Sequence, residues 1–190
     1  QRQMCIRDRR RLIRQSGKPF WQSETGPSKG QGLESNLLLA QKLFDDMRIM
    51  RPQAWLDWQL MEEGNNEWCV LRGNFKTQEY KVIKNLYVRM QITRFFKQGY
   101  TFIETGNAGT LAALSPTGKE LVIAVLNTTE ADSPLVIDLD KFAGKIASVS
   151  NWRTSETEDC QSFQAVKAKG KKLDYTRPAK SLTTFVINLK

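Results

Sequence analysis

The distribution of apolar residues changes near Tyr100 in this 190-residue chain. Before that point, apolar side chains recur at helical spacing over residues 33–50, and Pro52 would stop the helix. Residues 54–60 form a short run of bulky side chains, which predicts a buried strand. Residues 77–96 again carry an apolar face at helical spacing and predict a second amphipathic helix. Helices and strands are therefore both expected in the first half of the chain.

The second half of the chain contains short apolar runs separated by turn signals. One turn signal is Ser-Pro-Thr-Gly at residues 115–118, with Pro and Gly where a tight turn favours them. The runs are residues 111–114, 121–126, 135–139, 146–152 and 183–189. Together they predict an antiparallel β-sandwich over residues 100–190.

One carboxylate, Glu24, stands where a short strand would open into its loop. The apolar residues Phe20 and Trp21 precede it, and Thr25 and Gly26 follow it. A carboxylate at the carboxyl end of a parallel strand lies on the face where barrel enzymes build their active sites. By local pattern alone, the commoner interpretation is a solvated loop residue or a charge at a helix N-terminus.

Several motifs distributed along the chain occur together in one known family. They are Trp-Gln-Ser-Glu-Thr-Gly-Pro at 21–27, Asp-Asp at 45–46, Pro-Gln-Ala-Trp-Leu-Asp-Trp-Gln at 52–59, Lys-Asn-Leu-Tyr-Val-Arg-Met-Gln at 84–91, Arg-Phe-Phe-Lys-Gln-Gly-Tyr at 94–100 and Ser-Leu-Thr-Thr-Phe-Val at 181–186. With them, the chain resembles glycoside hydrolase family 30. Ser-Glu-Thr-Gly and Trp-Leu-Asp-Trp-Gln are most similar to the endo-β-1,6-galactanase-like branch. The resemblance covers nearly everything after Arg10.

The resemblance implies an α/β fold followed by an all-β domain. Residues 10–99 would form the last two β/α units of a (β/α)8 TIM barrel, with strands seven and eight, and residues 100–190 an antiparallel β-sandwich side domain. Residues 1–9 resemble a translated adapter peptide, and we expect them to be a non-native leader. Because a complete barrel takes about 250 residues, we expect the chain to be a C-terminal fragment.

The resemblance also implies a retaining O-glycosyl hydrolase acting on β-linked polysaccharide, with Glu24 as the catalytic nucleophile. Such enzymes place two carboxyl groups about 5 Å apart, one ionised to attack the anomeric carbon and one protonated to release the leaving sugar. Different environments must separate the two pKa values. In the family the acid/base lies on the fourth strand, so we expect it upstream of this chain and expect the fragment alone to be inactive. Asn66-Glu67 is similar to the pair around such an acid, but its position after Glu24 favours a solvated loop.

Tryptophans near the predicted eighth strand are candidates for substrate binding. An aromatic ring buries the apolar C–H face of a pyranose while polar neighbours bond its hydroxyl groups. Trp58 and Trp55 are the first candidates, and for both the alternative is packing in the barrel core or against a helix. Trp68 is a candidate for an outer subsite, and Gln59 would bond a sugar hydroxyl or cap the strand. Trp21 is expected in the core.

The residue types exclude most other hydrolytic chemistries. The chain has no histidine, so a Ser-His-Asp triad, a Cys-His pair and a histidine-ligated zinc are excluded within it. Outside the leader, Cys69 and Cys160 lie far apart, and their spacing indicates no metal site. They would pair in an oxidising compartment or remain buried thiols. We expect chemistry without a metal or another cofactor.

The net charge of +9 is dispersed along the chain. The densest basic segment, residues 167–172, has no aromatic residue interleaved, so a solvated turn explains it better than nucleic-acid binding. We expect a polysaccharide or oligosaccharide partner and no nucleic acid, and excess lysine would suit an acidic polysaccharide. No apolar run is long enough for a membrane span. The family implies a secreted or periplasmic protein, which we expect to be a monomer at full length.

A second class of function is a non-catalytic module formed by residues 100–190. An exposed row of aromatic side chains on one sheet would favour a carbohydrate-binding role. The aromatic residues of that segment are Tyr100, Phe102, Phe142, Trp152, Phe163, Tyr175 and Phe185. Most of them stand where core or turn residues are expected, which favours a structural β-sandwich that supports the barrel.

Overall fold

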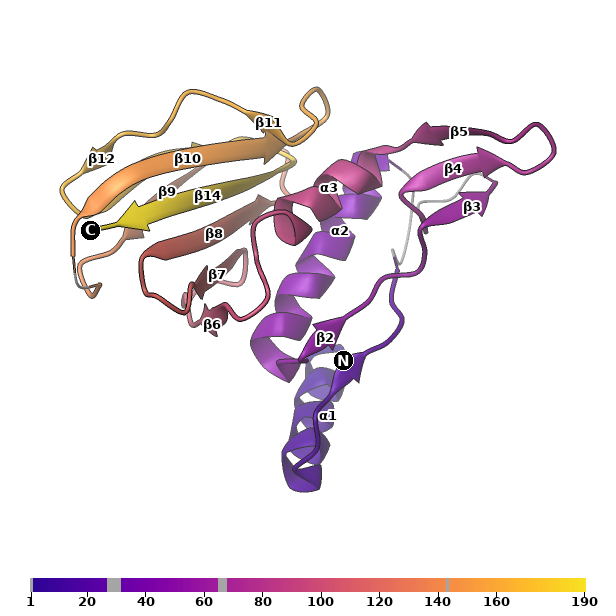
Figure 1. The fold of residues 1–190 in the computed structure, drawn as a ribbon, viewed down its shortest axis with the longest axis horizontal. Coiled ribbons are helices and arrows are strands. Elements are labelled where there is room, and N and C mark those ends of the chain that lie inside the picture. Colours follow the sequence, from indigo (N-terminus) through magenta and orange to yellow (C-terminus); the bar gives the residue numbers. More distant parts are fainter. Residues whose placement is uncertain (1, 27–31, 65–67, 143) are drawn as a thin grey trace. The chain divides into compact units, whose positions relative to one another are not determined.

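A computed structural model describes residues 2–26, 32–64, 68–142 and 144–190 of the chain (Figure 1). Its contacts divide the chain into two compact units, residues 1–86 and 87–190. The division falls inside helix α3, Lys84–Thr93, which therefore contributes residues to both units.

The first unit contains helices and short strands. These are α1 (Arg2–Ser16), β1 (Trp21–Gln22), α2 (Gly32–Asp45), the π-helical turn η1 (Asp46–Met50), β2 (Ala54–Trp55), β3 (Met61–Glu63), β4 (Leu71–Asn74) and β5 (Glu79–Val82). Strands β1 and β2 form a parallel pair. In a separate three-stranded sheet, β4 lies between β3, which is parallel to it, and β5, which is antiparallel.

The helix predicted over residues 33–50 is confirmed as α2 and η1. Its buried apolar residues include Leu33, Leu37, Ala40 and Phe44, which share one helical face. At its end, Arg51 adopts a left-handed conformation and its N–H donates to the carbonyl oxygen of Asp46 at 3.0 Å. Pro52 has no N–H with which to continue the helix, so the chain turns here into β2.

The strand predicted over residues 54–60 is wrong beyond its first two residues, since β2 ends at Trp55. The N–H of Trp58 donates both to Oδ1 of Asp57 at 2.9 Å and to the carbonyl oxygen of Thr25 at 2.7 Å. An aspartate side chain that accepts a nearby backbone N–H competes with the regular strand ladder. The backbone after β2 therefore forms a loop, in which the Trp58–Gln59 peptide bond is cis.

The helix predicted over residues 77–96 is wrong at its start, because residues 79–82 form strand β5. Oδ1 of Asn74 accepts the N–H groups of Lys76 at 3.0 Å and Thr77 at 3.2 Å, which closes a turn. Strand β5 then pairs with β4, placing Tyr80 opposite Gly73. Tyrosine and valine suit a paired strand as well as a helix face, and cross-strand pairing decides between the two.

The second unit is built from antiparallel strands. They are β6 (Thr101–Ile103), β7 (Thr110–Leu114), β8 (Glu120–Asn127), β9 (Ser133–Asp138), β10 (Ile146–Thr154), β11 (Gln161–Ser162), β12 (Ala168–Lys169), β13 (Lys172–Arg177) and β14 (Ser181–Leu189). One sheet has the order β11-β10-β14-β8-β7-β6 and the other the order β12-β13-β9. The strands predicted from the apolar runs are confirmed as β7, β8, β9, β10 and β14.

The six-stranded sheet of the second unit is buried on both faces. On one face, alternate residues of β8 and β14 share a core with β9 and β13 of the smaller sheet. This core includes Leu121, Ile123, Leu173, Phe185 and Ile187. On the other face, Val122 and Val186 contact the aromatic residues Phe95 and Trp152. Burial on both faces explains why β8 reads as an almost continuous apolar run rather than an alternating one.

A charged cluster joins the start of β8 to the segment after α3. Glu120 accepts hydrogen bonds from the hydroxyl group of Tyr100 and from Nζ of Lys97, the latter at 3.2 Å. The bond from Tyr100, followed by that from Lys97, holds the pKa of Glu120 below its usual value against the effect of partial burial. A carboxyl group with a lowered folded-state pKa stabilises the fold above its unfolded pKa, and this contribution disappears as the pH falls through the folded-state pKa.

Glu120→Gln should destabilise the second unit at pH 7 by about 1 to 2 kcal/mol, because it weakens charge-assisted hydrogen bonds. The difference from wild type should shrink at pH 3, where protonation removes much of the charge from wild-type Glu120 as well. Urea unfolding at both pH values measures this. Glu130→Gln, which alters only the surface ion pair with Lys180, is the matched control and should have a smaller effect. An equal loss for Glu120→Gln at both pH values would contradict the electrostatic explanation.

Candidate active site

Glu24 lies just beyond the carboxyl end of β1, with its side chain exposed. Strand β2 runs parallel to β1, so both strands end at the same edge of the pair. The N–H of Leu56 donates to the carbonyl oxygen of Gln22 at 2.8 Å, and the side-chain amide of Gln22 donates to the carbonyl oxygen of Glu24 at 2.7 Å. The backbone that carries Glu24 is therefore held from β1 and β2 together.

One backbone hydrogen bond joins the Glu24 loop to the segment that follows β2, and a second joins two segments that both follow β2. The N–H of Trp58 donates to the carbonyl oxygen of Thr25 at 2.7 Å. The N–H of Gln59 donates to the carbonyl oxygen of Trp68. Trp58, Gln59 and Trp68, the candidates for substrate binding, thus lie on segments that are bonded to one another and to the loop that carries Glu24.

Gly26 lies directly against the ring of Trp68. A Cβ atom at Gly26 would stand 2.5 Å from Cε3 and 2.7 Å from Cζ3 of the indole, which leaves no room for any side chain. Nζ of Lys42, on α2, lies 3.4 Å from the carbonyl oxygen of Gly26 and donates to it. The loop after Glu24 is therefore fixed by an indole ring and by a lysine of the neighbouring helix.

The two tryptophans of this region remain accessible. Trp58 is 46% exposed and Trp68 is 39% exposed. Exposed indole side chains are suited to the apolar face of a sugar. Trp55 differs, because its indole N–H donates to Oδ2 of the buried Asp46 at 3.1 Å. That contact with η1 supports the packing interpretation of Trp55.

Sequence reasoning missed Gly26, Lys42 and Asp46, whose roles depend on residues distant along the chain. The signal for Gly26 was present in the Ser-Glu-Thr-Gly motif, but the ring against it lies in another loop. Trp21, expected in the core, is 64% exposed, because β1 pairs with β2 alone among the described strands. Asn66-Glu67 lies outside the described residues.

Cys69 and Cys160 are both buried and neither forms a disulfide, which confirms the free-thiol alternative. Desolvation by burial raises the pKa of the Cys160 thiol, which favours its neutral form. Within the described ranges, no group of three or more Asp, Glu or Cys side chains is arranged to hold a metal ion. Over the same residues, no helix is both long and apolar enough to cross a membrane.

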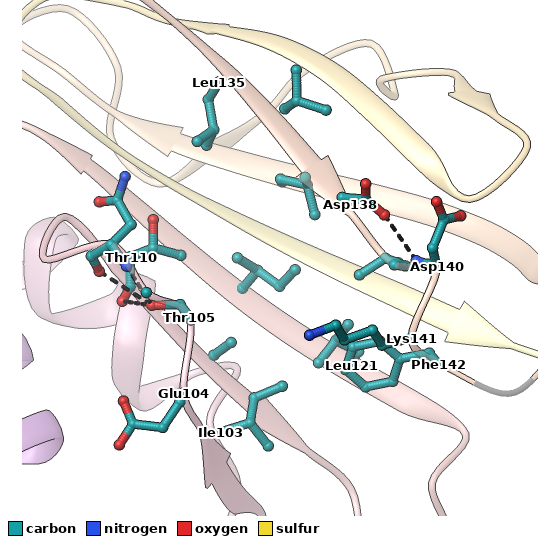
Figure 2. A pocket seen from close by; sticks show the side chains of 17 residues that line it. Ile103, Glu104, Thr105, Thr110, Leu121, Leu135, Asp138, Asp140, Lys141 and Phe142 are labelled. Carbon is teal, nitrogen blue, oxygen red and sulfur yellow. Dashed lines mark hydrogen bonds between the residues drawn. The ribbon is translucent and has the colours of Figure 1, made fainter.

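A cavity of about 630 Å³ lies in the second unit, away from Glu24 in the chain (Figure 2). Its walls are largely core side chains of the two sheets, including Leu121, Leu135 and Ile137. At one end, Oγ1 of Thr105 bonds the carbonyl oxygen of Thr110 at 3.0 Å, as Figure 2 shows. Phe142 is its one aromatic lining residue. The cavity thus lacks the row of aromatic rings that a carbohydrate-binding sheet would present.

Two predictions about the surface of the second unit can be compared with the structure. Of its seven aromatic residues named above, all in the described ranges, only Phe102 is classed as exposed, which supports the structural role over the carbohydrate-binding one. The basic segment forms the β12–β13 hairpin, in which Gly170 has a positive φ. Nζ of Lys172 pairs with Asp138 at 3.0 Å. The interpretation of this segment as a solvated turn is supported.

No family model matches the chain. The chain is 27% identical over 185 residues to an endo-β-1,6-galactanase from Hypocrea rufa, which covers 93% of this chain and 37% of that protein. A glycoside hydrolase family 30 subfamily 8 xylanase from Clostridium acetobutylicum has a TM-score of 0.75 at 22% identity, covering 94% of this chain and 44% of the xylanase. A conserved exported protein from Bacteroides fragilis has a TM-score of 0.73 at 17% identity, covering 97% of this chain and 43% of that protein.

The chain spans well under half the length of each of these proteins. Its sequence match is to a glycoside hydrolase, and its fold matches the corresponding part of a family 30 xylanase. These matches agree with the motifs at residues 21–27 and 52–59. In sequence this chain is similar to an endo-β-1,6-galactanase, and its fold is similar to part of a glycoside hydrolase family 30 xylanase.

Proposed function

We propose that the chain is the C-terminal part of a retaining O-glycosyl hydrolase that acts on β-linked polysaccharide, in the manner of an endo-β-1,6-galactanase. Glu24 is its catalytic nucleophile. The observation that carries the proposal is the position of Glu24 at the shared carboxyl edge of β1 and β2, in a loop fixed by Gly26 and Trp68. The galactanase from Hypocrea rufa supports the choice of substrate class.

In the proposed reaction, the ionised carboxylate of Glu24 attacks the anomeric carbon and forms a covalent glycosyl-enzyme. A protonated carboxyl group about 5 Å away donates its proton to the leaving oxygen and then activates the water that hydrolyses the intermediate. This acid/base belongs to a part of the protein that precedes these residues, so the 190-residue chain alone is inactive. No metal or cofactor takes part.

The substrate is held by the side chains gathered around Glu24. The exposed rings of Trp58 and Trp68 stack on sugar faces, and Gln59 bonds a sugar hydroxyl group. Trp55 was a further candidate, and we assign it to support the site through its bond with Asp46. The exposure of Trp58 and Trp68 and the bond between Trp55 and Asp46 support these roles.

The proposed enzyme has two parts in this chain, and their proposed boundary after residue 99 differs from the boundary after residue 86 between the two compact units. Strands β1 and β2, with α2 and α3, are the last two β/α units of a TIM barrel, over residues 10–99. Residues 100–190 are a β-sandwich, which is supported by two antiparallel sheets that share one core. Residues 1–9 are a non-native leader, of which residues 2–9 lie within α1. The similarity to an exported protein supports a secreted or periplasmic location, and we propose a monomer at full length.

The proposal is tested with the protein expressed from its complete gene. It should release reducing sugar from β-1,6-galactan faster than from glucuronoxylan or β-1,6-glucan. Proton NMR of the first product should show that the anomeric configuration is retained, because two displacements occur at one carbon. A first product of inverted configuration would exclude a nucleophilic role for Glu24. Activity on glucuronoxylan alone would show that the substrate is a xylan and not a β-1,6-galactan.

A further inference from the structure

The β4–β5 hairpin, residues 71–82, presents two large aromatic side chains to solvent. Phe75 is 60% exposed and Tyr80 is 66% exposed. Burying an aromatic side chain is strongly favourable, so two exposed rings on a short hairpin are available to a binding partner. Neither ring belongs to the site around Glu24.

The two rings lie on one supported surface. Strand pairing places Gly73 opposite Tyr80. A Cβ atom at Gly73 would stand 3.0 Å from Sδ of Met61 and 3.2 Å from Cε1 of Phe75, so both side chains close over this glycine. The N–H of Phe75 donates to Oε1 of Glu63 at 3.1 Å, which ties the turn to β3. The hairpin thus holds its aromatic side chains in a defined arrangement before any ligand arrives.

Next to these rings is a cavity of about 350 Å³ with a mixed lining. Its lining residues are Met61, Asn74, Phe75, Gln78, Glu79 and Tyr80. Ligand sites for small molecules begin at about 300 Å³ and combine apolar walls with a few polar groups. Here the aromatic rings suit the C–H face of a pyranose, and the amides of Asn74 and Gln78 with the carboxylate of Glu79 suit its hydroxyl groups. That combination matches a sugar better than it matches an apolar helix or a lipid.

The hairpin continues directly from the loops of the candidate active site. The N–H groups of Val70 and Leu71 donate to the carbonyl oxygen of Leu60 at 3.2 and 3.0 Å, immediately after Gln59. From Trp68 to Phe75 the chain can extend over at most about 25 Å. A polysaccharide held at Trp58 and Trp68 therefore has further sugars within reach of the hairpin.

We propose that the hairpin cavity, with Phe75 and Tyr80, binds a sugar of the polysaccharide substrate at a distance from the bond that is cleaved. This inference rests on the proposed function, since it concerns the same substrate. Contacts with distant sugars increase affinity for a polymer without contributing to binding of a short substrate.

Affinity electrophoresis of the full 190-residue chain tests this site without requiring turnover. The gels contain β-1,6-galactan, glucuronoxylan or β-1,6-glucan, and at least one of them should retard the wild-type chain. Phe75→Ala/Tyr80→Ala should raise the dissociation constant about tenfold or more. Phe102→Ala, which removes an exposed ring from the second unit, is the matched control and should bind as wild type. Tyr80→Phe keeps the ring and should retain most of the affinity.

Unchanged retardation of the double variant, or no retardation of the wild-type chain by any of the three glycans, overturns the hairpin site. If circular dichroism shows that the double variant is unfolded, the single variants Phe75→Ala and Tyr80→Ala are measured instead. Unchanged retardation of both single variants then overturns the hairpin site. Hydrolysis is measured separately with the protein from its complete gene. Binding through the hairpin with no hydrolysis of any glycan would refute the proposed function while leaving the sugar site in place.

Discussion

Glu24→Gln should reduce kcat on the polysaccharide by about 10³-fold or more in the protein expressed from its complete gene. The amide keeps the shape of the side chain but cannot form the covalent glycosyl-enzyme. Because Glu24 is exposed, the substitution should leave the unfolding midpoint almost unchanged, since surface changes usually cost less than about 0.5 kcal/mol. Reducing-sugar assays and urea unfolding of the same preparations measure both quantities.

A matched control and a rescue experiment separate a nucleophile from a general electrostatic role. Glu34→Gln changes an exposed carboxylate at the start of α2 and should leave kcat unaltered. Glu24→Ala opens space for an external nucleophile such as azide, which should restore turnover and give a glycosyl azide of inverted configuration. Full activity of Glu24→Gln would remove Glu24 from the chemistry and would leave the family resemblance as evidence of fold alone.

Gly26→Ala should lower kcat by about 100-fold, the second largest effect we expect. The new Cβ atom would stand 2.5 Å from Cε3 of Trp68, about 1 Å inside ordinary contact. Either the indole or the Glu24 loop must therefore move by a comparable distance, and such a displacement can cost about 100-fold in rate. Steady-state kinetics on the polysaccharide should show the loss in kcat, with a destabilisation of about 1 to 3 kcal/mol from overpacking.

The contact with Trp68 can be tested by a compensating change. Trp68→Phe shortens the ring and should mainly raise KM, because it weakens stacking on the sugar. The double variant Gly26→Ala/Trp68→Phe should recover a large part of the kcat lost in Gly26→Ala, since the overlapping ring atoms are gone. If kcat in the double variant is the product of the two single losses, the contact between Gly26 and Trp68 does not position Glu24.

Much of the secondary structure was accessible from the sequence because its causes are local. The apolar face of residues 33–50 allows one buried arrangement, a helix, and Pro52 ends it. The run in β8 is apolar at nearly every position because both faces of that strand are covered. Glu24 could be placed just after a short strand because the apolar residues Phe20 and Trp21 precede it in the chain.

Some secondary structure was predicted wrongly or left open because the local sequence fits two structures equally well. Tyr80 fits a helix face and a strand face alike, and only pairing with β4 made it a strand residue. For Trp55 the sequence left a sugar site and a helix interface both open, and its bond with the carboxylate of Asp46 supports the second. After β2, the side chain of Asp57 accepts the backbone N–H of Trp58, so the strand does not continue to residue 60 as predicted.

The sequence by itself determined the types of chemistry open to this protein and the approximate order of its strands and helices. The possible chemistry depends on residue type, as for Glu24. The order of strands and helices depends on the spacing of apolar residues along short segments, as in the strands after Tyr100. Only the tertiary structure decided which side chains surround Glu24 and that Phe75 and Tyr80 border one cavity. The physical reason is that a contact such as that between Gly26 and Trp68 depends on backbone hydrogen bonds between separate loops. The local spacing of apolar residues in the sequence does not predict such bonds.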